Sequence, residues 1–119
     1  MINVKDQIYA ALLKVCDNVS DSYPTDWVNY PAIQYVEEDN KVYEYTEQED
    51  MSYVRYKVDI WHDRSTSDIA LEVDKAISAL GLRRILCQDV EDTIKHKLMR
   101  YEGIVDNKTQ IVYQDGKGN

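Results

Sequence analysis

The chain has 119 residues, of which 44% are hydrophobic and 30% are charged, and its net charge is −8. This length and composition predict a single globular domain over residues 1–119 and exclude an intrinsically disordered chain. The negative charge disfavours general binding to nucleic acid, because the phosphate backbone repels an acidic protein.

The first third of the chain predicts one helix followed by a loop and a hairpin. Apolar residues at helical spacing predict a helix from Val4 to Cys16. Turn-forming residues and two prolines predict a loop over residues 17–31. Alternation then predicts a strand from Pro31 to Glu37 and another from Val42 to Thr46, with a hairpin turn at Asp39-Asn40 between them.

The longest strand is predicted from Met51 to His62, after an acidic spacer. Side chains alternate between the two faces of a strand, so this segment has one face for the core and one for solvent. The core face is predicted to comprise Ser52, Val54, Tyr56, Val58, Ile60 and His62.

The second half predicts a further helix and three further strands. The helix is expected from Ser67 to Leu80, because an apolar stripe follows an N-capping serine and Gly81 suits the position after a helix. The remaining elements are strands at Arg83–Gln88, Lys95–Val105 and Gln110–Tyr113, an acidic turn at Asp89–Asp92, and a polar tail at 115–119. The predicted fold class is therefore α+β, with two helices packed on a largely antiparallel sheet in the order α-β-β-β-α-β-β-β.

The string Asp59-Ile60-Trp61-His62-Asp63 is the segment that most resembles a chemical site. Two carboxylates and an imidazole could bind a divalent metal or act as acid and base. Alternation places Asp59 and Asp63 on one face and His62 on the other, which favours an ordinary strand end. His96 has no recognisable nucleophile arrangement near it in sequence, although folding could still assemble a triad.

Other motifs and long apolar segments are absent from the sequence. It contains no nucleotide-binding, zinc-protease or EF-hand pattern, so we expect no cofactor, no metal and no enzyme activity. Apolar runs are far shorter than the roughly 20 residues of a membrane helix, and the first residues show no secretion signal. We therefore expect no membrane partner and synthesis in the cytoplasm. Cys16 and Cys87 are expected to be buried free thiols.

Charge is distributed unevenly, with 13 acids and 6 bases in residues 1–64 but 9 and 8 in residues 65–119. The acidic segment, residues 37–50, has one base, Lys41, and these acids: Glu37, Glu38, Asp39, Glu44, Glu47, Glu49 and Asp50. The basic group comprises Arg83, Arg84, Lys95, Lys97 and Arg100. A solvated hairpin tip is the ordinary interpretation of the acidic segment. The alternative is that both groups lie at a head-to-tail subunit interface or in the lumen of a ring.

Several of these segments together resemble the tail-completion, or tail-terminator, proteins of long-tailed bacteriophages and prophages. The resemblance covers nearly the whole chain. It rests on the patterns of the helices Val4–Cys16 and Ser67–Leu80, the strand Pro31–Val36, the long strand Tyr53–Trp61, the string Gly81-Leu82-Arg83-Arg84 and the strand Met99–Gly103.

The resemblance implies a structural protein of the virion neck that is assembled in the host cytoplasm. Such proteins form a hexameric ring that ends polymerisation of the tail tube and joins the head connector, while DNA passes through the lumen without specific binding. It implies no catalytic or cofactor residue. The composition also leaves open a small cytosolic α+β enzyme or ligand-binding domain with a pocket near Asp59, His62 and Asp63. Ten tyrosines and no phenylalanine suit interfaces in either case.

Overall fold

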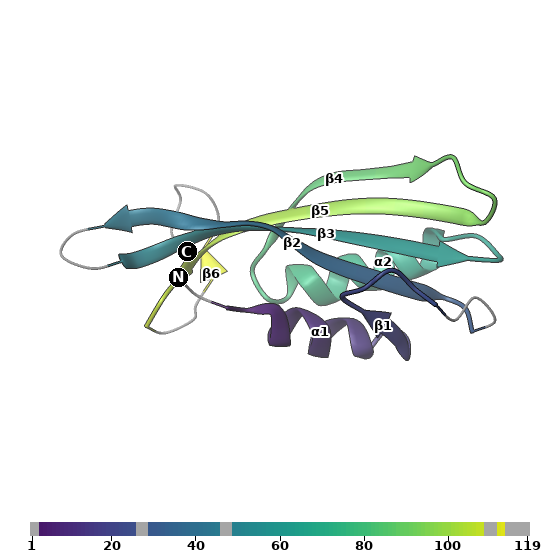
Figure 1. The fold of residues 1–119 in the computed structure, drawn as a ribbon, viewed down its shortest axis with the longest axis horizontal. Helices are drawn as coiled ribbons and strands as arrows, with labels where there is room; N and C mark the ends of the chain where they lie inside the picture. The colour runs from purple at the N-terminus through teal and green to yellow at the C-terminus, as the bar shows by residue number, and fades with distance from the viewer. Residues whose placement is uncertain (1–2, 26–28, 46–48, 109–111, 114–119) are drawn as a thin grey trace.

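The structure is a computed structural model that describes residues 3–25, 29–45, 49–108 and 112–113. In chain order the elements are α1 (Lys5–Leu13), β1 (Asn18–Ser20), β2 (Ala32–Tyr45), β3 (Glu49–His62), α2 (Ser67–Ser78), β4 (Arg83–Val90), β5 (Lys95–Asp106) and β6 (Val112–Tyr113). Figure 1 shows the strands in one sheet, with both helices on the same side of it. The predicted α+β class is confirmed.

The sheet has the strand order β1-β2-β3-β5-β4, and β6 pairs with the end of β5. β1 runs parallel to β2, and the pairs β2–β3, β3–β5 and β4–β5 are antiparallel. The sequence did not predict β1, whose three residues align with Ala32–Gln34. A strand this short carries too few residues to show alternation, so the parallel partner is what defines it.

The predicted turn at Asp39-Asn40 is wrong, because β2 continues through it as one strand of 14 residues. Asp39 is paired with Arg55 and Asn40 with Val54, and an irregularity after Glu37 shifts the register. The long partner strand β3 lets pairing continue past these two residues, and the bulge accommodates the extra residue. β2 ends at Tyr45, and β3 begins at Glu49.

The core lies between the helices and one face of the sheet. Val54, Val58 and Ile60 are fully buried, which confirms the predicted core face of the long strand. His62, predicted on that face, is only half-buried, because β3 ends there. Both predicted helices are present, although each is shorter than expected, and α2 is followed by Gly81 at a φ of 98°. A positive φ is accessible to glycine without steric cost.

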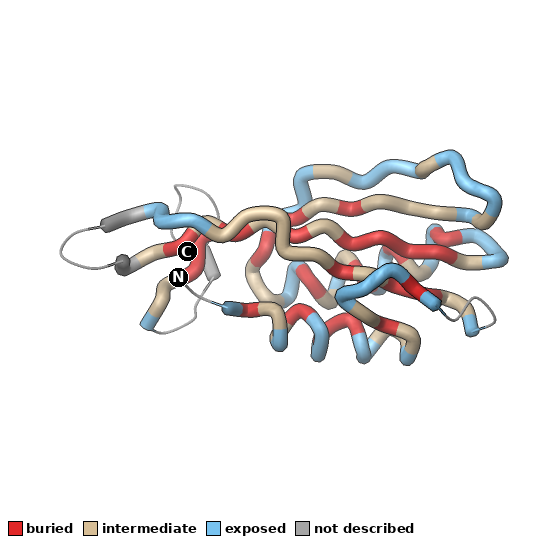
Figure 2. Tube along the Cα trace, viewed as in Figure 1, coloured by how far each residue is buried: buried red, intermediate tan, exposed pale blue. Residues whose placement is uncertain are grey.

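The molecule is elongated, with extents of 50 × 24 × 23 Å. The far halves of β2 and β3 extend beyond the helices as an arm, which lies at the left in Figure 1. Figure 2 shows the buried residues concentrated where the helices cover the sheet, with β4 largely exposed at its edge.

No helix in the described part of the chain is long and apolar enough to cross a membrane. The cysteine prediction is wrong for Cys87, which is exposed on β4, while Cys16 is half-buried.

Candidate functional site

The strongest polar cluster lies on the outer face, which we define as the face of the sheet away from α1 and α2. His96 of β5 is at its centre. Its Nε2 lies 2.8 Å from Oδ1 of Asp59, and its Nδ1 lies 3.2 Å from Oδ2 of Asp92. The contact with Asp92 does not have the geometry of a hydrogen bond. Both ring nitrogens therefore face a carboxylate.

Trp61 holds this histidine in place from one side. The two rings stack with centroids 4.4 Å apart and an angle of 24° between their planes. The Trp61 indole also donates a hydrogen bond to Asp92 at 3.3 Å. Strand pairing explains the stack, because Trp61 of β3 lies directly opposite His96 of β5.

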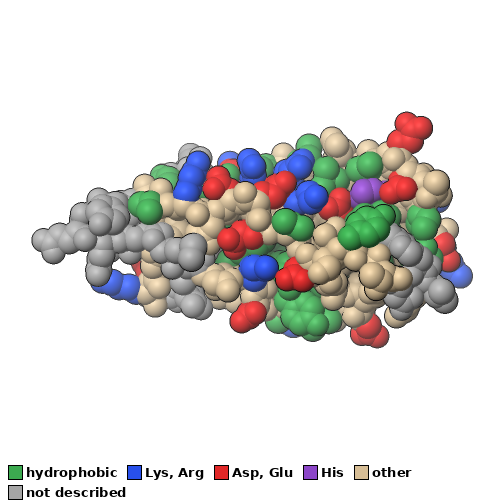
Figure 3. Space-filling model, in the orientation of Figure 1, with side chains coloured by type: hydrophobic (Ala, Val, Ile, Leu, Met, Phe, Trp, Pro, Cys, Tyr) green, Lys and Arg blue, Asp and Glu red, His purple; other side chains and the backbone are tan. Residues whose placement is uncertain are grey.

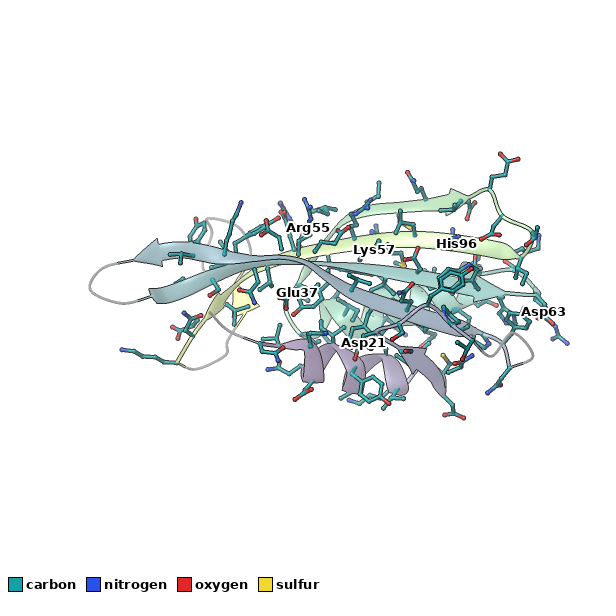
Figure 4. The ribbon with its side chains drawn as sticks, in the orientation of Figure 1. Asp21, Glu37, Arg55, Lys57, Asp63 and His96 are labelled. Carbon is teal, nitrogen blue, oxygen red and sulfur yellow. The ribbon has the colours of Figure 1, made fainter. Side chains whose placement is uncertain are left out.

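The two carboxylates of the cluster differ in their surroundings. The Asp59 side chain is only 7% exposed, and its second oxygen lies 3.4 Å from the Lys57 ammonium. Asp92 is more exposed, and the backbone N–H of Thr93, followed by the Trp61 indole, lowers the pKa of its carboxyl. Asp59 thus has a charged partner in Lys57, whereas the hydrogen bonds to Asp92 favour its ionised form. Figure 4 shows Lys57 and His96 on the same side of the sheet.

The alternative grouping of Asp59, His62 and Asp63 in one site does not form. Asp59 contacts His96 instead, whereas His62 Nδ1 lies 2.9 Å from Asp63 Oδ1 at the end of β3. The expectation that His62 and Asp63 point apart is wrong, because the strand ends at His62 and alternation no longer applies to the next residue. The spacing of Asp92 and His96 is present in the sequence, but Asp59 joins them only through the pairing of β3 with β5.

An open depression of about 680 Å³ adjoins this cluster at the end of the sheet. It is lined by Asp63, by residues 65–67 at the start of α2, and by residues 89–96, from the end of β4 to the start of β5. A smaller hollow of about 280 Å³ lies beside Tyr23 and Trp61. Among the residues that the structure describes, no three His, Cys, Asp or Glu side chains are arranged to hold a metal ion.

The predicted interface residues that the structure describes lie on a sheet with many ion pairs. Glu38 accepts two hydrogen bonds from Arg100, at 2.9 and 3.2 Å, and lies 3.4 Å from Arg55. Glu37 instead accepts a hydrogen bond from Tyr56 on the helix side, at 2.7 Å. Figure 3 shows positive and negative side chains interleaved along the sheet. The side chains of Glu44, Glu47, Glu49 and Asp50 lie outside the described residues.

Three of the predicted basic residues also have acidic partners within the chain. Arg83 pairs with Glu102, Arg84 with Asp74 at 3.4 Å, and Lys97 with Asp89 at 2.8 Å; Lys95 is exposed. Sequence reasoning missed these acids because each lies on a different element from its partner. The basic group is therefore divided between the two faces of the sheet, since Arg83 and Arg100 lie on the outer face while Arg84 and Lys97 lie on the helix side.

Comparison with known proteins gives this chain no family. No protein-family model matches it, and no curated protein is significantly similar to it in sequence.

Proposed function

We propose that the chain is a structural tail-completion protein that forms a ring on the tail tube, ends tube polymerisation and provides the joint to the head connector. The observation that carries the proposal is the arm formed by β2 and β3, which extends beyond the helical body. An element that projects from a small domain is well placed to contact a neighbouring subunit. Its partners would be other copies of this chain, the tube protein and the connector.

The charge of the arm supports the same proposal. The described part of the arm includes Glu44 and Glu49 of the acidic segment, whose only base is Lys41. An acidic wall facing a ring lumen would repel DNA and let it pass without binding. An acidic arm that instead contacts a neighbour would meet basic residues there.

The test is to polymerise the tube protein encoded with this chain, with and without the purified chain, and to measure tube lengths by negative-stain microscopy. The proposal expects shorter tubes that carry a ring at one end. Native mass spectrometry should show a closed homo-oligomer either alone or with short tubes. Unchanged tube lengths without end rings would rule the proposal out.

A second candidate, a small ligand-binding domain, is favoured by one observation. The Asp59, His96 and Asp92 cluster borders an open depression large enough for a small molecule. With both His96 nitrogens facing carboxylates, the cluster suits binding of a polar ligand better than acid–base catalysis. Elemental analysis and ligand-induced changes in melting temperature would test it, with His62→Ala as the control, since Asp63 itself lines the depression. A stoichiometric metal lost in His62→Ala would assign chemistry to the end of β3.

A further inference from the structure

β4 is an edge strand whose outer side carries no strand in the described part of the chain. It pairs with β5 on its inner side, and six of its eight residues are exposed. An edge of this length presents a row of backbone donors and acceptors to another chain. One irregularity, between Arg84 and Leu86, leaves Ile85 without a paired residue on β5.

The sequence of β4 is complementary to itself when two copies run antiparallel with Cys87 opposite Cys87. In this register Leu86 lies opposite Gln88, and the bulge at Arg84 and Ile85 lies opposite Asp89. The faces also agree. Arg84, Cys87 and Asp89 pair with Tyr101, Met99 and Lys97 of β5, which alternate on the helix side of the sheet, so these three side chains share that side.

Charge favours this register over a random meeting of edges. It brings Arg84 of each copy next to Asp89 of the other, and the two-fold axis repeats the contact. The side chains of Arg84 and Asp89 are 47% and 80% exposed, so each can reach a second partner besides its own ion pair. Charged residues on an edge ordinarily prevent pairing. Here the same residues become attractive toward an identical strand.

An exposed leucine lies on the same flank of the molecule. Leu71 of α2 is 64% exposed, and it is three residues before Asp74, on the same side of the helix. Asp74 accepts a hydrogen bond from Tyr101 and pairs with Arg84, so this side of α2 faces β4. The chain reverses direction at Gly81, so α2 and β4 run antiparallel. Leu71 lies one helical turn before Asp74, and it is therefore displaced from Arg84 in the direction of Cys87. Apolar surface therefore flanks the centre of the edge.

We propose that β4 is a self-association surface, on which β4 of a second copy pairs antiparallel about a two-fold axis at Cys87 and brings Leu71 of both copies toward the contact. Such a contact is isologous, whereas the proposed ring needs head-to-tail contacts, so the inference goes beyond the proposed function and does not depend on it. The partner is a second copy of this chain because the edge complements its own sequence in charge and in face.

The first test reverses the two charges. Arg84→Asp and Asp89→Arg should each weaken the dimer, measured by analytical ultracentrifugation, with roughly a tenfold or greater rise in Kd. An equimolar mixture of the two variants should recover a heterodimer, and the double variant should recover a homodimer. Thermal melting identifies any variant whose fold is lost. A wild-type chain that stays monomeric at high concentration, or single variants that dimerise normally, would overturn the proposal.

The second test uses the exposed thiol with a short bis-maleimide crosslinker in a Cys16→Ser background. Cys87 should give a covalent dimer, and Arg84→Asp should abolish it. The matched control moves the thiol to another exposed strand position, Tyr43→Cys with Cys87→Ser, and should give no dimer. Leu71→Ser should weaken the dimer, whereas Leu13→Ser, on α1, should not. A dimer that persists without a Cys87 crosslink places the contact elsewhere. Tube-length assays with Leu71→Ser, which lies outside both charge groups, show separately whether the proposed function fails.

Discussion

Arg100 on β5 donates two hydrogen bonds to Glu38 on β2, reaching across β3 between them. Glu38 belongs to the acidic segment and Arg100 to the basic group, so the two sets of charges meet within one chain at this point. The bidentate contact with Glu38 raises the pKa of the Arg100 guanidinium. Any contact between subunits must therefore depend mainly on other members of the two groups.

Removing this carboxylate should destabilise the monomer. Glu38→Ala removes the carboxylate that accepts hydrogen bonds from Arg100 and forms an ion pair with Arg55, and we expect a loss of about 1–2 kcal/mol in the free energy of unfolding by urea. Glu38→Gln should lose less, because the amide oxygen still accepts a hydrogen bond. High salt should reduce the difference between wild type and Glu38→Ala. Equal stability of all three proteins at low salt would contradict this role.

The inner face of β3 should not tolerate a charge. Val58→Asp or Ile60→Asp places an unpaired carboxylate at a fully buried position, which should cost several kcal/mol and unfold the domain. Circular dichroism at increasing temperature measures the effect. Tyr43→Asp, on the half-exposed part of β2, is the matched control and should melt close to wild type. A cooperative, normal transition for Val58→Asp would mean that the faces of β3 are assigned incorrectly.

The fold could be predicted where a local pattern is long enough to repeat. The alternation along β3 and the apolar stripe of α2 each continue for several periods, so both elements and their core faces followed from sequence. β1 is too short for this, and the residues Asp39 and Asn40 favour a turn locally although strand pairing overrides them. Tyr56, which the sequence placed on the core face, is fully buried together with Tyr101, and their hydroxyls donate to Glu37 and Asp74 at the margin of the core.

The polar cluster could not be predicted, because its members are adjacent only through strand register. Asp59 and His96 are 37 residues apart, and they meet because β3 and β5 pair antiparallel with Trp61 opposite His96. Nothing in the local sequence of either strand specifies that register. The residues from Asp59 to Asp63 are consecutive, but adjacency along a strand predicts side-chain contact less well than pairing between strands does.

Asp59 should be more important for stability than its predicted place at an ordinary strand end suggested. Asp59→Ala leaves His96 Nε2 and the Lys57 ammonium without their common carboxylate in a largely buried setting, and we expect a loss of about 1–3 kcal/mol in unfolding free energy. Asp59→Asn keeps an acceptor oxygen and should lose less. Chemical denaturation followed by tryptophan fluorescence is suitable, since Trp61 stacks on His96. Indistinguishable unfolding curves for wild type and Asp59→Ala would count against the cluster.

Glu102 should make stability depend on acid pH. Burial raises the pKa of its carboxyl, but hydrogen bonds from Arg83 and Tyr53 outweigh this and lower the pKa below its ordinary value. The folded state therefore favours the ionised form, so the stabilisation is present above the ordinary pKa of about 4.3 and is lost as pH falls through the lower folded value. Between about pH 6 and about pH 3, which lie above and below that pKa, the melting temperature of Glu102→Gln should fall less than that of wild type. Parallel curves would refute the linkage.

The arm should carry the assembly function without supporting the fold. Changing Glu44, Glu47 and Glu49 to Lys together should weaken capping of tail tubes while the melting temperature stays near that of wild type, because the three are charged residues outside the apolar pattern of the sequence. The control has the same change in net charge at exposed positions away from the arm, namely Asp68→Lys, Glu72→Lys and Glu91→Lys. It should cap normally.

Charge reversal of the basic residues tests the contact between subunits less directly than the sequence suggests. Changing Arg83, Arg84 and Lys97 to Glu breaks their ion pairs with Glu102, Asp74 and Asp89, so this variant should melt at a lower temperature as well as assemble poorly. If acids of the arm contact the basic group across subunits, a mixture of the basic-residue variant and the arm variant should partly restore capping. Capping by wild type should also weaken as salt rises, because exposed ion pairs are screened. Normal capping by the arm variant at low salt would leave the acidic segment as a solvated hairpin with no part in assembly.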